Sequence, residues 1–186
     1  MVVATEQGTA TFTFSDANNG TFNYVIGAVN QTKNITREVF GALPTCSFGA
    51  VADLTTATNY QDLWWNKPAN SESGWGINLN HEGDTIFATW FTYDLDGSPL
   101  WLVVTANKTG PGVYTGDLFR TSGTRFDAFA PGNVVSRKVG TATLTFADGN
   151  DATLNYTVQV SGMATPVTQA KSITREIFTA PGTACH

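Results

Sequence analysis

Hydrophobic and polar positions alternate along most of the chain with the two-residue period of a β-strand. Residues 75–80 read Trp-Gly-Ile-Asn-Leu-Asn, and residues 142–146 place alanine, leucine and phenylalanine between threonines. Such alternation predicts strands with one face in a core and one face toward solvent. Residues 85–94 (TIFATWFTYD) are apolar on both faces, so we expect this strand to be covered on both sides. No window keeps a 3.6-residue period, so we expect little helix.

Turn residues separate these apolar runs at short intervals. Asn-Gly and Asp-Gly pairs and related triplets are hairpin signals, and they occur at residues 19–20, 82–84, 96–97 and 148–150. Consecutive hairpins predict an all-β fold in which an antiparallel meander closes into a barrel or folds into a sandwich. We favour the barrel, because closure removes the strand edges that would otherwise be exposed.

The two ends of the chain contain copies of one sequence. Residues 8–26 (GTATFTFSDANNGTFNYVI) match residues 140–158 (GTATLTFADGNDATLNYTV), and residues 32–40 (TKNITREVF) match residues 170–178 (AKSITREIF) after six extra residues. Similarity over so long a stretch indicates a duplication. The block 64–120 occurs once, so the chain reads as a full repeat preceded by the tail of another.

This order predicts two parts, a partial repeat of three strands over residues 1–44 and a complete barrel unit over residues 45–186. Three short strands bury too little apolar surface to be stable alone. We therefore expect the partial repeat to pack on the full unit, to replace the second copy in the barrel, or to exchange between molecules. Other copies of the same repeat are accordingly candidate partners.

Three tryptophans lie close together in the stretch NYQDLWWNKPANSESGWGINLN, residues 59–80. Trp64 and Trp65 are adjacent, so on a strand their rings point to opposite faces, and we expect at least one to be available. Aromatic rings beside the polar loop 66–73, at a barrel mouth, suit a flat apolar ligand or a sugar that polar groups orient. The candidate ligand-binding residues are Trp64, Trp65, Glu72, Asn78, Asn80 and Trp101.

The alternative is that all five tryptophans fill the core of a small barrel. Of the five, we expect Trp90 and Trp101 to be the more buried pair, and Trp64 and Trp65 to be the more exposed pair.

The sequences SGW at residues 73–75 and TRE at residues 174–176 resemble the calycin pattern of lipocalins and avidins. In those barrels a first-strand tryptophan near a glycine packs beneath an arginine of the final strand and closes the floor. The resemblance implies a structural stacking pair of Trp75 and Arg175, in a barrel of a kind that binds small hydrophobic ligands.

A larger part of the chain is similar to a repeat module of secreted proteobacterial proteins. Segments of the types WWN…ESGWGINL, GDTIFATWFTYD and TREVF recur in that module, sometimes in tandem, and the similarity covers most of residues 60–178. It implies export and a modular protein, and it implies no particular activity.

Composition narrows the function classes. Only 13% of residues are charged and the net charge is −5, whereas charged residues make up about 25% of an average globular domain. An acidic chain with scattered lysines and arginines argues against a nucleic-acid surface and an anionic-membrane site. No stretch approaches the roughly 20 apolar residues of a membrane span, so we do not expect membrane insertion.

The expected location is outside the cytoplasm. Residues 1–10 lack the features of a signal peptide, but the Thr/Asn/Gly-rich composition is typical of exported bacterial β-proteins. We expect a secreted, periplasmic or cell-surface protein whose mature part follows a start methionine.

Cys46 and Cys185 bracket the predicted full unit and belong to no C-x-x-C pair, so they do not resemble zinc ligands. If residues 46–185 close on themselves, the two sulfurs can bond. The bond would stabilise the fold by about 4–5 kcal/mol in the chain-entropy model. Two free thiols at equivalent repeat positions are the alternative, and we favour the disulfide.

Catalytic and metal-binding residue types are sparse. His81 is the only internal histidine and lies beside a turn, and Glu72 with Asp94 is a candidate acid pair for glycoside hydrolysis. The acidic stretch 93–99 suits a tight turn and has too few oxygen ligands for a calcium loop. We therefore expect no catalytic residues, no metal and no cofactor.

Taken together, these features predict a non-enzymatic, exported β-barrel module that binds a small apolar molecule or a glycan through an aromatic-rich rim. The alternative is a structural or adhesive tandem-repeat element of a bacterial surface protein, with no small-molecule ligand.

Overall fold

The computed structural model describes residues 5–51 and 53–186. Apart from one short 3₁₀ turn at Pro131–Asn133, all regular structure in these residues is β-strand. The strands are β1 (Gly8–Phe14), β2 (Asn19–Ile26), β3 (Val29–Thr36), β4 (Cys46–Val51), β5 (Asp62–Asn66), β6 (Gly76–Glu82), β7 (Thr85–Tyr93), β8 (Pro99–Gly110), β9 (Val113–Ser122), β10 (Val135–Phe146), β11 (Asp151–Val158), β12 (Val167–Arg175) and β13 (Gly182–Cys185).

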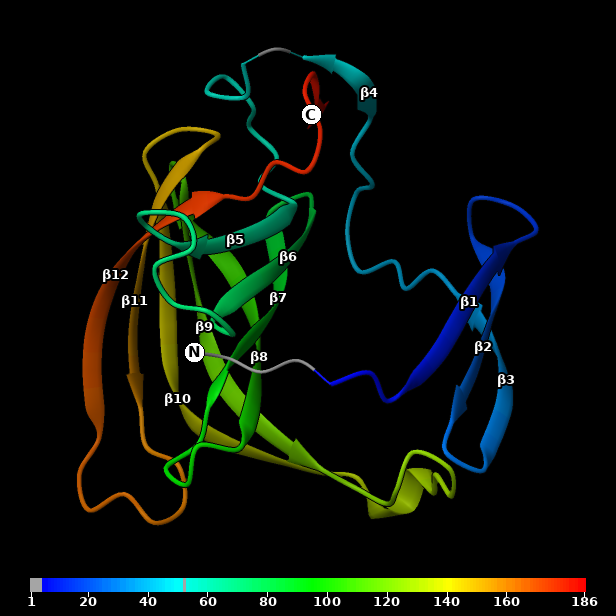
Figure 1. Cartoon of the computed structure of the whole chain (residues 1–186). Helices are drawn as coiled ribbons and strands as arrows, with labels where there is room; N and C mark the ends of the chain where they lie inside the picture. Colours follow the sequence, from blue (N-terminus) through cyan, green and yellow to red (C-terminus); the bar gives the residue numbers. More distant parts are fainter. Residues whose placement is uncertain (1–4, 52) are drawn as a thin grey trace. The chain divides into compact units, whose positions relative to one another are not determined.

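Strands β5 to β12 form a closed, eight-stranded barrel in which each strand pairs antiparallel with the next along the chain (Figure 1). The barrel closes where β12 pairs with β5, with Thr174 opposite Trp65 and Arg175 opposite Trp64. This confirms the predicted antiparallel meander barrel and rules out the sandwich. Closure lets the backbone donors and acceptors of the wall pair with one another all the way round.

The barrel interior is filled by the alternating apolar residues that the sequence pattern indicates. Ile77, Leu79 and Leu144 are among the fully buried side chains, and burial of each contributes about 1.5–3 kcal/mol. An eight-stranded barrel is just wide enough to be filled in this way. The expectation for β7 is wrong on one face, because its inner residues are buried but Phe91, on the outer face, is 47% exposed.

The chain separates into two units, one comprising the chain up to Val39 with Gly123–Val134, and the other comprising Phe40–Ser122 with Val135–His186. The division falls before Phe40 instead of at residues 44–45. The reason is that the Glu82 carboxylate accepts hydrogen bonds from the backbone N–H groups of Phe40 (2.8 Å) and Gly41 (2.9 Å). The segment 123–134, which lies within the predicted barrel unit by sequence, belongs to the first unit.

The two sequence copies pair their strands in the same way. Gly8 of β1 lies opposite Ile26 of β2, and Gly140 of β10 lies opposite Val158 of β11, which is the same register one repeat later. The second copy is part of the barrel, whereas β1, β2 and β3 form a separate three-stranded sheet. The first copy therefore does not replace the second copy in the barrel wall.

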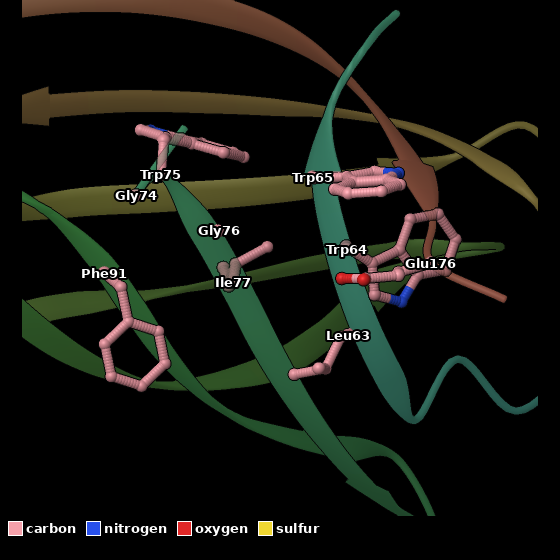
Figure 2. A pocket seen from close by; sticks show the side chains of 9 residues that line it. All are labelled: Leu63, Trp64, Trp65, Gly74, Trp75, Gly76, Ile77, Phe91 and Glu176. Atoms are coloured by element: carbon pink, nitrogen blue, oxygen red, sulfur yellow. The ribbon is translucent and has the colours of Figure 1, made fainter. Parts of the chain in front are cut away.

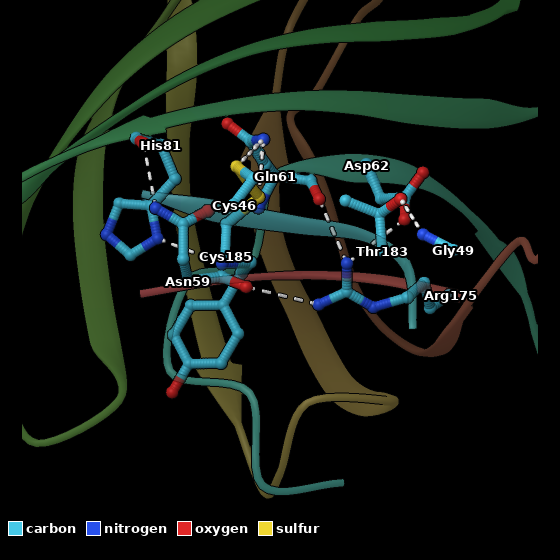
Figure 3. The surroundings of a disulfide bond; sticks show 10 residues. Cys46, Gly49, Asn59, Gln61, Asp62, His81, Arg175, Thr183 and Cys185 are labelled. Atoms are coloured by element: carbon cyan, nitrogen blue, oxygen red, sulfur yellow. Dashed lines mark hydrogen bonds and ion pairs between the residues drawn. A yellow bond between two sulfur atoms is a disulfide. The ribbon is translucent and has the colours of Figure 1, made fainter. Parts of the chain in front are cut away.

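One end of the barrel is held by Arg175, whose side chain is buried at the end of β12 (Figure 3). Its guanidinium donates hydrogen bonds to three backbone carbonyls and pairs with one carboxylate: Gly149 (2.7 Å), Gln61 (2.9 Å), Asn59 (3.3 Å) and Asp62 (3.1 Å). A buried charge is tolerated only when it is paired and hydrogen-bonded in this manner. The arginine thus ties β12 to β5 and to the β10–β11 turn.

The aromatic partner of Arg175 is Trp64, with 5.1 Å between the guanidinium carbon and the ring centre. The predicted pairing of Arg175 with Trp75 is wrong, because the β5–β12 register sets Trp64 directly opposite Arg175. Trp75 instead lies under the ammonium group of Lys171, 5.4 Å from its ring centre. Its ring also meets Trp90 edge to face at 6.3 Å.

Cys46 and Cys185 form a disulfide that joins β4 to β13 across 139 residues of sequence. This confirms the predicted bond, and the alternative of two free thiols is wrong. The side-chain amide nitrogen of Gln61 lies 2.9 Å from the Cys185 sulfur (Figure 3). The two ends of the barrel unit are therefore linked covalently, next to the start of β5, the first barrel strand in the sequence.

Candidate functional site

A groove on the outer wall of the barrel is the best candidate for a binding site. It has a volume of about 240 Å³, and Figure 2 shows it over β5 and β6. The lining residues are Leu63, Trp64, Trp65, Gly74, Trp75, Gly76, Ile77, Phe91 and Glu176. Because Trp64 and Ile77 point inward, alternation places the side chains of their strand neighbours on the outer surface, where they shape the groove.

The groove exists because Gly76 has no side chain. Gly76 lies opposite Phe91 in the β6–β7 pair, and Trp64 lies opposite Ile77 in the β5–β6 pair. A gap is therefore left on the outer face between the Trp65 and Phe91 side chains. A Cβ atom on residue 76 would meet nothing closer than the Trp64 carbonyl oxygen at 3.6 Å, which is ordinary contact. The space above Gly76 can thus be narrowed by substitution without disturbing the wall.

The loop that leads into β6 is fixed against the neighbouring hairpin. The Tyr93 hydroxyl donates a hydrogen bond to the Ser73 carbonyl (3.3 Å). Gly74 has a φ of +84°, and a Cβ there would overlap the Tyr93 hydroxyl. Only glycine meets both conditions without strain, so Gly74 sets the position at which Trp75 enters the barrel end and borders the groove.

The aromatic surface continues beyond the groove. Phe91 lies directly opposite Trp101 in the β7–β8 pair, and Trp101 is 51% exposed on the outer face. Trp65 is half-buried at the other side of the groove. Contiguous exposed apolar patches of this kind mark contact or ligand surfaces, whereas single exposed hydrophobic residues are ordinary.

Glu176 supplies the charged group of the groove. Its backbone N–H donates a hydrogen bond to the Leu63 carbonyl (2.8 Å), which fixes the residue just after β12. Figure 2 shows its carboxylate between Leu63 and the Trp65 ring. Sequence reasoning missed Glu176, Gly76 and Phe91. The available signal was their position in the sequence, since each directly follows a buried tryptophan or arginine and so faces the opposite side of the wall.

Glu72 does not line the groove. Its carboxylate accepts hydrogen bonds from the Lys171 ammonium (2.5 and 2.7 Å) and from the Asn66 amide (3.3 Å). These bonds hold the 66–75 loop against β12. The Lys171 ammonium also faces the Trp75 ring, so Glu72 acts in positioning the loop and its tryptophan.

Asn78 and Asn80 face outward from β6, Asn78 half-buried and Asn80 exposed. Asn78 lies opposite Leu63 in the β5–β6 pair, next to the groove but outside its lining. Asn80 is the next outward-facing residue of β6 and lies further from the groove than Asn78. Of the six candidate ligand-binding residues, the structure therefore brings only Trp64 and Trp65 together at the groove, and Trp101 extends the same surface through Phe91.

Two expectations about tryptophan exposure are wrong. Trp64 is only 1% exposed, and its indole N–H donates a hydrogen bond to the Tyr60 carbonyl (3.0 Å). Trp101 is exposed because it alternates with Leu100 and Leu102, which point into the barrel. Trp65 fits the expectation that one of the adjacent pair remains available.

A second, smaller cavity of about 150 Å³ lies inside the barrel end beneath the β7–β8 turn. Trp90, Tyr156 and Met163 are among its lining residues. Burial raises the pKa of the Tyr156 hydroxyl, and the charge of Glu72 raises it further, so this phenol is neutral at physiological pH. The cavity is small, and its walls combine core side chains such as Leu102 with the exposed side chains of Tyr93 and Leu95.

His81 lies in the barrel interior and has a structural set of contacts. Its Nδ1 accepts a hydrogen bond from the Tyr60 backbone N–H (3.0 Å), and Nε2 lies 3.0 Å from the Gly83 carbonyl and 3.1 Å from the Tyr114 hydroxyl. Burial lowers the pKa of His81, and an acceptor role for Nδ1 fits the neutral ring.

The carboxylates considered at the sequence level are paired with cations. Asp94 forms an ion pair with Arg120 (2.7 Å), and Glu72 pairs with Lys171. The Asp94–Ser98 stretch forms the predicted tight turn, closed by hydrogen bonds from Asp94 N–H to the Ser98 carbonyl and from Gly97 N–H to the Asp94 carbonyl. In residues 5–51 and 53–186 no group of three or more histidine, cysteine or acidic side chains is arranged to hold a metal ion.

No protein-family model matches this chain, and a comparison with curated proteins found no match.

Proposed function

We propose that this protein is an exported, non-enzymatic β-barrel module that binds a small saccharide through the groove on its outer wall. The observation that carries the proposal is the gap above Gly76, bordered by the Trp65 and Phe91 rings with the Glu176 carboxylate at one end. Aromatic faces accept the C–H faces of a sugar ring, and a carboxylate accepts hydrogen bonds from its hydroxyl groups.

The size and chemistry of the groove favour a saccharide over a purely apolar molecule. Its volume of about 240 Å³ is below the roughly 300–1,000 Å³ of sites that enclose drug-sized ligands. A short sugar, or one residue of a longer glycan, suits a shallow groove of this size. A purely apolar ligand would leave the Glu176 carboxylate desolvated without a donor, which is unfavourable.

In the part of the chain that the structure describes, side chains fill most of the barrel interior. Its centre is filled by fully buried side chains such as Leu79, Leu102 and Leu144, and the cavity at its end is smaller than the outer groove. A ligand held inside the barrel, as the calycin resemblance implies, would have to displace these side chains. The outer wall is therefore the better supported position.

Export is part of this proposal. The disulfide is compatible with an extracellular protein, because such bonds form and persist in oxidising compartments. The described residues contain no helix with the length and apolar character needed to cross a membrane.

The test is a glycan array of defined mono- and oligosaccharides, followed by calorimetric titration of the strongest saccharide. Trp65→Ala should weaken binding about tenfold, corresponding to the loss of one aromatic contact. Gly76→Leu should abolish binding by filling the gap, whereas Gly76→Ala, which fits without overlap, should retain most of it. Asn80→Ala, outward on the same strand but away from the groove, is the matched control and should bind normally.

The results distinguish a saccharide bound in the groove from an apolar ligand in the groove and from a saccharide bound elsewhere. No saccharide binding, together with binding of the apolar dye 1-anilinonaphthalene-8-sulfonate that Gly76→Leu removes, would replace the saccharide with an apolar ligand. Saccharide binding that is unchanged in both Trp65→Ala and Gly76→Leu would move the site away from the groove.

The alternative function, a structural or adhesive element, is favoured by one observation. Phe91 and Trp101 form an exposed aromatic pair on the wall, as a surface that contacts another protein would. Sedimentation of the protein with and without Trp101→Lys measures such self-association, and a monomer at all concentrations argues against contacts between copies through this pair.

A further inference from the structure

The three-stranded sheet of the first unit has the strand pairing of a barrel segment but no barrel around it. In β10, β11 and β12 the same sequence pattern is joined to β9 on one side and to β5 on the other. In the first copy, β1 and β3 are the outer strands of a sheet of three. Their outer backbone groups are thus unpaired by strands of the described chain, at the two positions where the second copy gains neighbours.

One face of this sheet corresponds to the inner face of the barrel. Phe12 and Phe14 occupy the positions of Leu144 and Phe146, which are buried in the barrel core. In the first copy Phe12 is 59% exposed and Phe14 is 69% exposed. A face with two stacked, exposed phenylalanine rings, 6.5 Å apart between centres, is a surface that natural proteins cover.

Part of this face is already built as it is in the barrel. The Tyr24 hydroxyl donates a hydrogen bond to the Gln31 side chain, as Tyr156 does to Gln169 in the second copy. Within the first unit, the segment 123–134 covers this end of the sheet, where the Gln31 amide donates to the Asp127 carbonyl (3.1 Å). The end with the exposed phenylalanines is left uncovered by that segment.

Arg37 shows what chemistry the missing neighbour must have. Arg37 corresponds to Arg175, and its guanidinium donates hydrogen bonds to the Ala17 carbonyl (3.2 and 2.9 Å), as Arg175 does to the equivalent Gly149 carbonyl. The other contacts of Arg175 come from β5 and the residues just before it: the Asp62 carboxylate, the Gln61 and Asn59 carbonyls and the Trp64 ring.

In the described part of the chain, Arg37 lacks the contacts that Arg175 receives from the neighbouring strand. Among residues 5–51 and 53–186 it has no ion pair, and it is exposed. A neighbouring strand that complements Arg37 would therefore carry an aspartate and, two residues later, a tryptophan, as β5 does with Asp62 and Trp64.

From these observations we infer that the β1–β3 sheet is the receiving part of a second barrel, completed by a five-stranded segment of the β5–β9 kind from another copy of this module. The first strand of that segment pairs with β3 and sets its aspartate and tryptophan on Arg37, and its last strand pairs with β1. The inference concerns a surface of the first unit and does not depend on the proposed saccharide groove.

The fit between the sheet and this chain's own β5–β9 differs at two core positions. Phe12 and Phe22 are larger than Leu144 and Leu154, the fully buried leucines at the equivalent sites. Added volume in a filled barrel forces strain. The natural segment is therefore expected to have smaller residues opposite these two positions, and the test must allow for the difference.

The experiment adds the missing strands in cis. A chain is made in which a second copy of residues 59–139 precedes Gly8, so that Val139 joins Gly8 as it joins Gly140 in the natural sequence. A second version also contains Phe12→Leu and Phe22→Leu, which restore the leucines of the closed barrel. Hydrogen exchange with mass spectrometry then compares peptides of β1 and β3 with those of β10 and β12 in the same molecule.

We expect exchange in β1 and β3 to slow at least a hundredfold relative to the natural chain, toward the rates of β10 and β12, in at least one of the two versions. Asp62→Ala in the added copy should remove much of this protection, and the matched change Asp117→Ala in the added copy, at an exposed ion pair, should not. The inference is overturned if both versions exchange in β1 and β3 as fast as the natural chain. It is equally overturned if a monomeric natural chain already protects β1 as strongly as β10.

Discussion

Replacing Arg175 with methionine is expected to destabilise the barrel unit by about 3–5 kcal/mol, the cost of removing one partner from a buried charged network. Methionine fills much of the arginine volume but carries no donor. The carbonyls of Gly149, Gln61 and Asn59 then lose a hydrogen bond, and the Asp62 carboxylate loses its counter-ion.

The magnitude follows from the individual contacts. A buried carbonyl left without a donor costs about 1–3 kcal/mol, and loss of the cation–π contact with Trp64 adds about 0.5–2 kcal/mol. The upper limit of that sum is not reached, because the Asp62 side chain is 32% exposed and water can replace part of its bonding. Arg175→Lys keeps the charge but cannot reach three carbonyls at once, so its effect should be intermediate.

The assay is urea unfolding followed by tryptophan fluorescence. All five tryptophans lie in the barrel unit, so the signal reports that unit alone. Lys138→Met, whose ion pair with Asp117 is exposed on both sides and lies in the same unit, is the control and should cost less than about 1 kcal/mol. A change below about 1 kcal/mol for Arg175→Met would refute the role assigned to this residue.

Three further effects are expected. Reducing the disulfide, which closes 139 residues of chain, should lower the free energy of unfolding by about 5 kcal/mol in the chain-entropy model, and urea midpoints that coincide with and without reductant would contradict this. Burial lowers the pKa of His81 below its ordinary value of about 6.5; the unfolded chain therefore binds the extra proton, and stability present above about pH 6.5 is lost as the pH falls below it. His81→Gln should flatten that part of the pH profile of the urea midpoint, and an unchanged slope would assign it to other groups. Gly149→Ala places a Cβ on the Leu54 carbonyl and should cost about 3 kcal/mol by overpacking, whereas Gly132→Ala, with open space around it, should be neutral, as thermal melts of the two variants would show.

The strands and turns could be predicted from the sequence because their signals are local. A two-residue period marks a half-buried strand wherever it occurs, and the Asp-Gly and Asn-Gly pairs specify tight turns through their own backbone preferences. The equivalence of residues 8–26 and 140–158 could be read directly, and it extends to the register of their hairpins.

The tryptophans show where this reasoning stops. Adjacent residues on a strand point to opposite faces, so the pattern required one of Trp64 and Trp65 to be inside and one outside. Which of them is buried depends on the pairing of β5 with β6 and β12, and a slip of one residue would exchange them. The same register decides that Arg175 meets Trp64 and not Trp75.

The candidate site needed the tertiary structure for a related reason. Glu72 is of a residue type that binds sugars, yet its carboxylate is paired with the Lys171 ammonium. Glu176, which was not among the predicted ligand-binding residues, faces the groove.

The hairpins, the similarity of the two ends of the chain and the position of the cysteines around one unit could be read from residue order, since each is a property of neighbouring residues or of direct comparison. Which indole is buried, which carboxylate faces a gap, and that the absent side chain at Gly76 opens a groove became known from the folded barrel. Those outcomes depend on contacts between strands far apart in sequence, whose register is set by the closing of the whole barrel.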